Sequence, residues 1–202
     1  MTTPIPLVES CVQLERLRKR WNREEYKQLC EARPMPHLEL VEGELIDKMG
    51  KNWPHISALT LLHGWLIGVF GLRMVHQEAS IDVSPEDNPT SQPEPDLIAT
   101  KDDLASYVDK GRPAPQDLLL VIEVADSSLH LDLVDKAGLY ARAGIADYWV
   151  LVIPSRRMIV HRDPRNGAYG SVASFGAEEQ IAPLAAPDAF LRIGDVFVGG
   201  RG

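Results

Sequence analysis

The sequence contains little cysteine and lacks several common catalytic motifs. Its two cysteines, Cys11 and Cys30, are too few for a thiolate zinc site and have no spacing that indicates a redox pair. We expect both to be reduced thiols. The sequence also has no glycine-rich phosphate loop ending in Lys-Ser/Thr, no His-Glu-x-x-His and no Gly-x-Ser-x-Gly. These absences argue against a disulfide-built miniprotein, a nucleoside-triphosphatase and a serine hydrolase.

Long uninterrupted hydrophobic runs are also missing. The most apolar stretch, Pro54 to Arg73, is broken by His63, Gly64 and Gly68, and it barely reaches the roughly 18 residues that a membrane-spanning helix needs. We therefore expect a buried core helix over Ile56 to Phe70. The start of the chain has no basic and apolar signal segment. A cytoplasmic location without membrane contact is the expectation.

Positive charge is in short supply. The sequence has 29 acidic and 21 basic residues, which gives a formal net charge of -8. Proteins that bind nucleic acid without regard to its sequence usually carry a broad positive potential, so this balance argues against that class. An acidic excess also arises where a metal site collects carboxylates whose charge is offset once the cation binds.

Length and composition indicate an ordinary globular protein. The chain has 202 residues, of which 45% are hydrophobic and 25% charged, and such a chain buries a sizeable core without disulfides. We expect an N-terminal extension over residues 1–20 and a single domain over residues 21–202. Alternating apolar residues on both sides of Glu42-Gly43 predict a hairpin of two short strands.

Apolar periodicity and turn residues predict the other elements. In chain order, we expect a helix from Asn22 to about Cys30, a helix from Pro54 to Gly71, an extended segment from Arg73 to Val83, a loop from Ser84 to Pro95, a short strand from Pro95 to Ala99, a polar connection containing Gly111, Pro113 and Pro115, a strand from Leu118 to Val124, a helix from Leu131 to Ala143, a strand from Tyr148 to Ile153, and a terminal meander over Met158 to His161 and Tyr169 to Phe175.

Two acidic residues lie in strands that are otherwise apolar. Asp96 follows Pro95 at the start of one strand, and Glu123 interrupts the aliphatic run of the next. A buried carboxylate is costly unless it is paired, hydrogen-bonded or bound to a metal. Two such groups side by side repel each other, and magnesium, which prefers hard oxygen ligands, would relieve that repulsion. The structural alternatives are a buried ion pair for Glu123 and an ordinary turn position for Asp96.

The helix after this strand supplies a third candidate. Asp132, Lys136 and Tyr140 follow one another at intervals of four residues and therefore share one helix face. Lys136 could reach back over the strand ends, where its charge would orient an attacking water and stabilise charge on a phosphate. The alternative is a solvent-exposed pair of Asp132 and Lys136, worth only about 0.3 to 0.5 kcal/mol.

At these residues the sequence resembles a known family. The shared pattern consists of Pro95-Asp96, Glu123-Val124-Ala125-Asp126, Asp132-x-x-x-Lys136-x-x-x-Tyr140 and the segment Ala141 to Trp149, and it extends back to Leu38 to Glu44 and to His55. The pattern is similar to that of the Uma2 family of restriction endonucleases, which belongs to the PD-(D/E)xK nuclease superfamily. The resemblance covers roughly Trp21 to Phe197.

The resemblance implies a restriction-endonuclease-like α/β fold, with a central mixed sheet flanked by helices and a β-rich C-terminal meander. Asp96 and Glu123 would be catalytic residues that bind Mg²⁺, or Mn²⁺. Lys136 would replace the catalytic lysine that the superfamily places two residues after the glutamate, where this chain has alanine. Glu39 matches an acidic residue of the family's N-terminal motif and would be a further catalytic residue, with a solvent-facing strand position as the alternative. His55 also matches, with a structural role at a helix start as the alternative.

The function that the resemblance implies is a metal-dependent endonuclease that hydrolyses phosphodiester bonds, with DNA as the expected partner, by metal-activated water. Two alternatives stay open: a catalytically inactive nucleic-acid-binding or protein-interaction module on the same fold, and a metal hydrolase with another substrate, which suits the acidic charge. Cutting both strands would most simply use a homodimer. Nothing in the sequence identifies an interface, a target or a preference between DNA and RNA.

Overall fold

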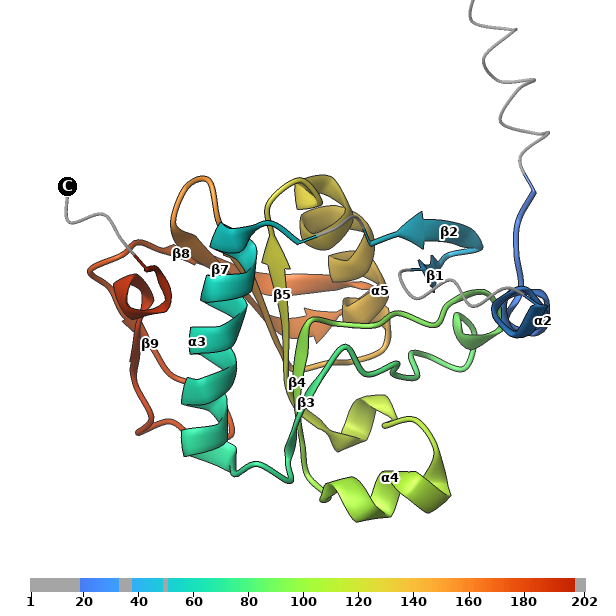
Figure 1. Cartoon of the computed structure of the whole chain (residues 1–202), viewed down its shortest axis with the longest axis horizontal. Helices are drawn as coiled ribbons and strands as arrows, with labels where there is room; N and C mark the ends of the chain where they lie inside the picture. Colours follow the sequence, from blue (N-terminus) through green and yellow to red (C-terminus); the bar gives the residue numbers. More distant parts are fainter. Residues whose placement is uncertain (1–18, 33–37, 49–50, 199–202) are drawn as a thin grey trace, which may run out of the picture.

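A computed structural model describes residues 19–32, 38–48 and 51–198 of the chain (Figure 1). Most of the expected N-terminal extension, and Cys11 with it, therefore lies outside the described residues. The helices and strands are α2 (Arg23–Ala32), β1 (Leu38–Val41), β2 (Glu44–Asp47), α3 (Trp53–Phe70), β3 (Val75–Gln77), η1 (Asn88–Thr90), β4 (Leu97–Thr100), α4 (Leu104–Lys110), η2 (Pro115–Asp117), β5 (Leu118–Ala125), η3 (Leu131–Lys136), α5 (Ala137–Arg142), β6 (Asp147–Val152), β7 (Arg157–Arg165), β8 (Ala168–Phe175), β9 (Gln180–Ile181), β10 (Leu191–Arg192) and η4 (Ile193–Val196).

The centre of the fold is a six-stranded mixed sheet with the order β3-β4-β5-β6-β7-β8. Only β5 and β6 run parallel, and all the other neighbours in this sheet are antiparallel. Parallel neighbours need a crossover connection, and here that connection contains η3, which is wound as a π-helix, and α5. Helix α3 lies on one face of the sheet and α5 on the other (Figure 1). The expected fold class, a mixed sheet flanked by helices, is confirmed.

Strand β5 is buried on both faces, as its aliphatic run predicts. Because side chains alternate along a strand, Leu120, Ile122 and Val124 pack in the core on the α3 side. Val121 and Ala125 pack in the core on the α5 side. Glu123 therefore projects toward η3 and α5, and this direction decides which helix residues it can meet.

Helix α3 begins where the sequence provides a cap and a proline. The side-chain oxygen of Asn52 accepts a hydrogen bond from the backbone N–H of His55 at 3.0 Å, and proline follows in the first turn. The helix buries the face that carries Leu62 and Leu66, which confirms the prediction of a core helix. Within the described part of the chain, no helix combines the length and apolar character needed to cross a membrane. The cytoplasmic location stays a prediction.

The turn signals in the sequence are confirmed. The side chain and backbone of Asn22 exchange hydrogen bonds with those of Glu25, which forms the expected capping box of α2. Glu42 and Gly43 have φ angles of 48° and 79° and join β1 to β2 in the expected hairpin.

Three expectations for other elements were wrong. The extended segment that was predicted from Arg73 to Val83 contains only the short strand β3. The polar connection before β5 includes a helix, α4, which begins after the side-chain cap of Asp103. The C-terminal strands β7 and β8 do not form a separate meander, because they extend the central sheet by pairing with β6 and with each other.

We predict that the α3 face is a main source of stability. Leu66 is fully buried, so Leu66→Ala should lower the free energy of unfolding by about 2 to 5 kcal/mol. Leu72 is 70% exposed just beyond the same helix, and Leu72→Ala should change it by no more than about 0.5 kcal/mol. Urea unfolding of both variants measures the difference, and equal effects would contradict this packing.

Candidate active site

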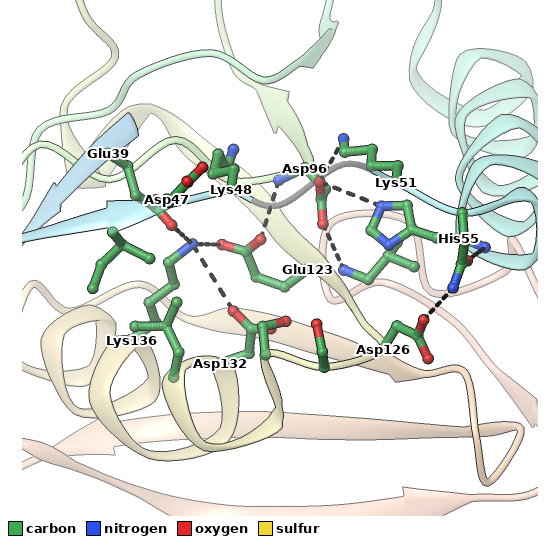
Figure 2. A pocket seen from close by; sticks show the side chains of 16 residues that line it. Glu39, Asp47, Lys48, Lys51, His55, Asp96, Glu123, Asp126, Asp132 and Lys136 are labelled. Atoms are coloured by element: carbon green, nitrogen blue, oxygen red, sulfur yellow. Dashed lines mark hydrogen bonds and ion pairs between the residues drawn. The ribbon is translucent and has the colours of Figure 1, made fainter. Parts of the chain in front are cut away.

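A pocket of about 470 Å³ opens beside the C-terminal end of β5 (Figure 2). Its walls come from the β1–β2 hairpin, the start of α3, the end of β5 and η3. The charged side chains that line it are Glu39, Asp47, Asp96, Glu123, Asp126, Asp132, Lys48, Lys51 and Lys136. Acidic groups therefore outnumber basic ones around this cavity.

The ammonium group of Lys136 lies among three carboxylates (Figure 2). Its Nζ is 2.8 Å from Glu39 Oε1, 2.9 Å from Glu123 Oε1 and 3.9 Å from Asp132 Oδ1. The lysine is only 1% exposed. Burial alone would lower the pKa of Lys136, but the surrounding carboxylates raise it well above its ordinary value. Lys136 therefore stays charged and joins β1, β5 and η3 through one group.

Glu123 is held from several sides. Besides Lys136, the hydroxyl of Tyr140 donates to Oε1 at 3.2 Å, and the backbone N–H of Asp96 lies 3.3 Å from Oε2. Burial raises the pKa of Glu123 to about 8, and the neighbouring acids Asp132, Asp96 and Glu39 add to this effect while Lys136 opposes it. The environment of Glu123 therefore lacks positive charge even with Lys136 present.

Asp96 lies immediately before β4 and next to Glu123 on the neighbouring strand, since Leu97 pairs with Ile122. Its Oδ2 accepts the backbone N–H of Val124 at 2.8 Å, and its Oδ1 accepts Lys51 Nζ at 3.0 Å. Although burial works to raise it, these contacts keep the pKa of Asp96 below its ordinary value. Asp96 is therefore an ionised carboxylate beside Glu123.

His55 reaches the same acid from the first turn of α3. Its Nε2 is 3.8 Å from Asp96 Oδ1, and this buried atom has no hydrogen-bond partner within the described residues. Burial lowers the pKa of His55, and Asp96 offsets part of that effect. An unpaired buried nitrogen that faces a pocket is available to a water or a ligand.

The buried charges in the pocket do not balance. Four carboxylates are at most 5% exposed, whereas the positive charge comes from buried Lys136 and half-buried Lys51, so two negative charges are in excess. Burial also raises the pKa of Asp132 to about 6. Buried charge without a partner is unfavourable, and a divalent cation would supply the missing two charges. The four acids are Glu39, Asp96, Glu123 and Asp132.

The donor set suits a hard cation that keeps water ligands. Asp96 and Glu123 offer carboxylate oxygens from adjacent strands, and magnesium commonly binds one or two carboxylates and retains several waters. In the ranges that the structure describes, no group of three acidic, histidine or cysteine side chains forms a ready-made metal cage. The residues therefore fit an open site better than an all-protein one.

All the site residues expected from the sequence line this single pocket, namely Glu39, His55, Asp96, Glu123 and Lys136. Two of the structural alternatives were wrong. Lys136 does not form an exposed pair with Asp132, and Glu39 does not face solvent, because each is 1% exposed. The alternative of a buried ion pair for Glu123 is correct in geometry and coexists with its place in the pocket.

Sequence reasoning missed Lys51. This residue binds both Asp96 and Glu78 from the segment just before α3, where no periodic pattern or motif distinguishes it. A basic residue next to the helix cap of Asn52 was the only available signal. Asp126, which stands where the family often has serine, accepts a hydrogen bond from the Asn52 side chain and so belongs to the rim.

Comparisons with known proteins agree with this arrangement. A family model, Uma2, described as "Putative restriction endonuclease", matches residues 23–194. The chain belongs to the Uma2 family. A solved structure from Anabaena variabilis ATCC 29413, described as a "putative nuclease belonging to DUF820", is similar with a TM-score of 0.66 and 15% identity, over 88% of this chain and 97% of that chain. A search of curated proteins found no match.

Membership of the Uma2 family supports a nuclease function, and the solved structure shows that the fold is shared. The family match spans all five expected site residues, from Glu39 to Lys136. In this Uma2 chain, the residues that carried the resemblance are also the ones that the fold brings together in the pocket.

We predict that Lys136 is required for stability. Lys136→Met removes the ammonium that three carboxylates share, so the free energy of unfolding should fall by about 3 to 5 kcal/mol. Adding Glu39→Gln should recover part of this loss, because one uncompensated charge disappears. Thermal and urea unfolding measure both effects.

The matched control is Lys110→Met, which removes an exposed partner of Asp102 and should change the free energy of unfolding by no more than about 0.5 kcal/mol. Lowering the pH from about 8 to about 6 should stabilise Lys136→Met, because the folded state then takes up protons on its unpaired acids. A Lys136→Met protein as stable as the control would contradict the assigned role.

Proposed function

We propose that this protein is a metal-dependent endonuclease that hydrolyses phosphodiester bonds in DNA, with Asp96 and Glu123 as ligands of Mg²⁺ or Mn²⁺. The observation that carries the proposal is the pair of buried carboxylates on adjacent strands, in an open pocket with two more buried negative than positive charges. Family membership supports the nuclease class. The PD-(D/E)xK assignment, the metal and DNA are parts of this proposal.

The bound cation would polarise a phosphoryl oxygen and lower the pKa of a water molecule, which is the chemistry that phosphodiester hydrolysis needs. Asp96 contributes an ionised carboxylate, because Lys51 and the Val124 N–H stabilise its charge. Glu123 is oriented by Tyr140 and Lys136. These fixed contacts preorganise both acids.

The other pocket residues have distinct roles in the proposal. Lys136 places a fixed positive charge beside Glu123, where it stabilises negative charge that develops on the phosphate. Glu39 fixes that ammonium through Oε1 and accepts the backbone N–H of Glu94 through Oε2. His55 Nε2, which is unpaired beside Asp96, is placed to hydrogen-bond a water or a phosphate oxygen.

An inactive binding module on the same fold makes a different prediction. Such a module would have no reason to keep buried acids in excess around a pocket, since unpaired buried charge reduces stability. It would bind nucleic acid without cleaving it and without needing a divalent cation. A hydrolase of another phosphodiester would cleave a small substrate but not DNA.

We predict that wild-type protein cleaves DNA only with Mg²⁺ or Mn²⁺, and that Asp96→Asn or Glu123→Gln reduces the rate by about 100-fold or more, as when one preorganised electrostatic group is lost. Cleavage is measured by gel electrophoresis on supercoiled, linear and single-stranded DNA, with RNA and a small phosphodiester in parallel. Calorimetry measures Mg²⁺ and Mn²⁺ binding independently, and that binding should disappear when both acids are neutralised.

Asp147→Asn is the matched control. Asp147 is also a buried strand aspartate, 1% exposed, but it binds Arg162 and the indole of Trp149 outside the pocket. This variant should lose stability and keep both metal binding and the cleavage rate of its folded fraction. Cation binding without cleavage of any substrate would favour the inactive module, and cleavage unaffected by Asp96→Asn would refute the assigned site.

A further inference from the structure

Trp53 is far more exposed than a tryptophan in a stable fold needs to be. Its side chain is 80% exposed, whereas Trp149 is fully buried and Trp65 packs against Trp149 with ring centroids 6.3 Å apart. Leaving an indole in water gives up the large gain from burying an aromatic ring. The core does not use Trp53, so its surface is available to a ligand.

The position of Trp53 connects this indole to the pocket. Trp53 is the first residue of α3, and Lys51, Asn52 and His55 on both sides of it line the cavity. The same end of α3 lies near the C-terminal end of β5, which carries Glu123 (Figure 1). Asn52 fixes this helix end by capping His55 and by donating a hydrogen bond to Asp126. The indole therefore stands on a rigid rim of the proposed active site.

We infer that Trp53 stacks on an unpaired base next to the phosphodiester in the pocket, so that the preferred substrate is single-stranded or locally unpaired nucleic acid. This inference rests on the proposed nuclease function. A base inside a duplex is already stacked between its neighbours, so an exposed indole gains a base only where the strand is unpaired, at an end or extruded. Stacking on aromatic side chains accepts every base and gives little sequence preference.

The charge distribution supports the same choice. Binding along a duplex depends mainly on lysine and arginine contacts with many phosphates. Here the chain has a net charge of -8, Lys51 is engaged by Asp96 and Glu78, and Lys48 donates to the carbonyl of Glu94. Few cations at the pocket are free for phosphates. Base stacking is therefore the main source of affinity that the rim offers, and the salt dependence should be shallow.

The test measures binding separately from cleavage. A short fluorescein-labelled single-stranded DNA is titrated with protein in Ca²⁺, with gels to verify that the strand stays intact, and anisotropy gives the affinity. Trp53→Ala should weaken binding by about 10-fold or more, the effect of losing one stacked base, while Trp53→Phe should keep most of it. Leu72→Ala, which truncates an exposed apolar residue beyond the other end of α3, is the control and should bind as wild type.

Three further arms decide between explanations. A strand that lacks the bases near the cleavage position should bind wild type and Trp53→Ala equally, and blunt duplex should bind more weakly than single strands. Unchanged affinity in Trp53→Ala, or an equal loss with the base-free strand, would overturn the inference. A change in oligomeric state in Trp53→Ala would also overturn it and assign the indole to a contact between copies. Tight, Trp53-dependent binding without cleavage in Mg²⁺ would leave the inference standing and refute the proposed function instead.

Discussion

The pocket depends on one buried ammonium. Lys136 contacts carboxylates from three elements that are far apart in the sequence: Glu39 on β1, Glu123 on β5 and Asp132 on η3. Its charge allows the three acids to be buried together, since each would otherwise face the cost of an uncompensated ion. It also fixes the β1–β2 hairpin against the sheet. The same contact that stabilises this corner of the fold therefore brings the acidic groups into one cavity.

The topology of β5 explains why these groups meet. Alternation along β5 turns Glu123 toward the α5 face, with Val121 and Ala125. Because β6 is parallel to β5, the connecting helix must cross over that face. The crossover begins as the π-helix η3, whose wider turn brings Asp132 and Lys136 inward together. A one-residue shift in β5 would send Glu123 into the opposite core, away from the lysine.

Sequence reasoning succeeded where the signal was local. The Glu42-Gly43 turn, the capping box of α2 and the apolar run of β5 each follow from backbone preferences or side-chain periodicity, and the structure confirms them. The grouping of Asp96 with Glu123 followed from two acids in apolar strands. The burial of Lys136 could not be predicted from spacing, because an exposed Asp-Lys pair has the same spacing. Lys51 reaches Asp96 from an irregular segment, where no periodicity exists. Helix α4 was missed because its residues are mostly exposed and give no apolar pattern.

The unequal charge of the pocket constrains the order of events in the proposed reaction. A phosphate that approaches Asp96 and Glu123 meets two excess buried negative charges and only one fully buried lysine. Coulomb repulsion in a poorly solvated site is strong, so the phosphate group gains access chiefly after a cation has offset those charges. By linkage, a cation that raises the affinity for the phosphate must be held more tightly by the same factor when the phosphate is bound. Metal and substrate binding are therefore coupled in this proposal, whereas stacking on Trp53, which is outside the acidic cluster and uncharged, contributes affinity without that requirement.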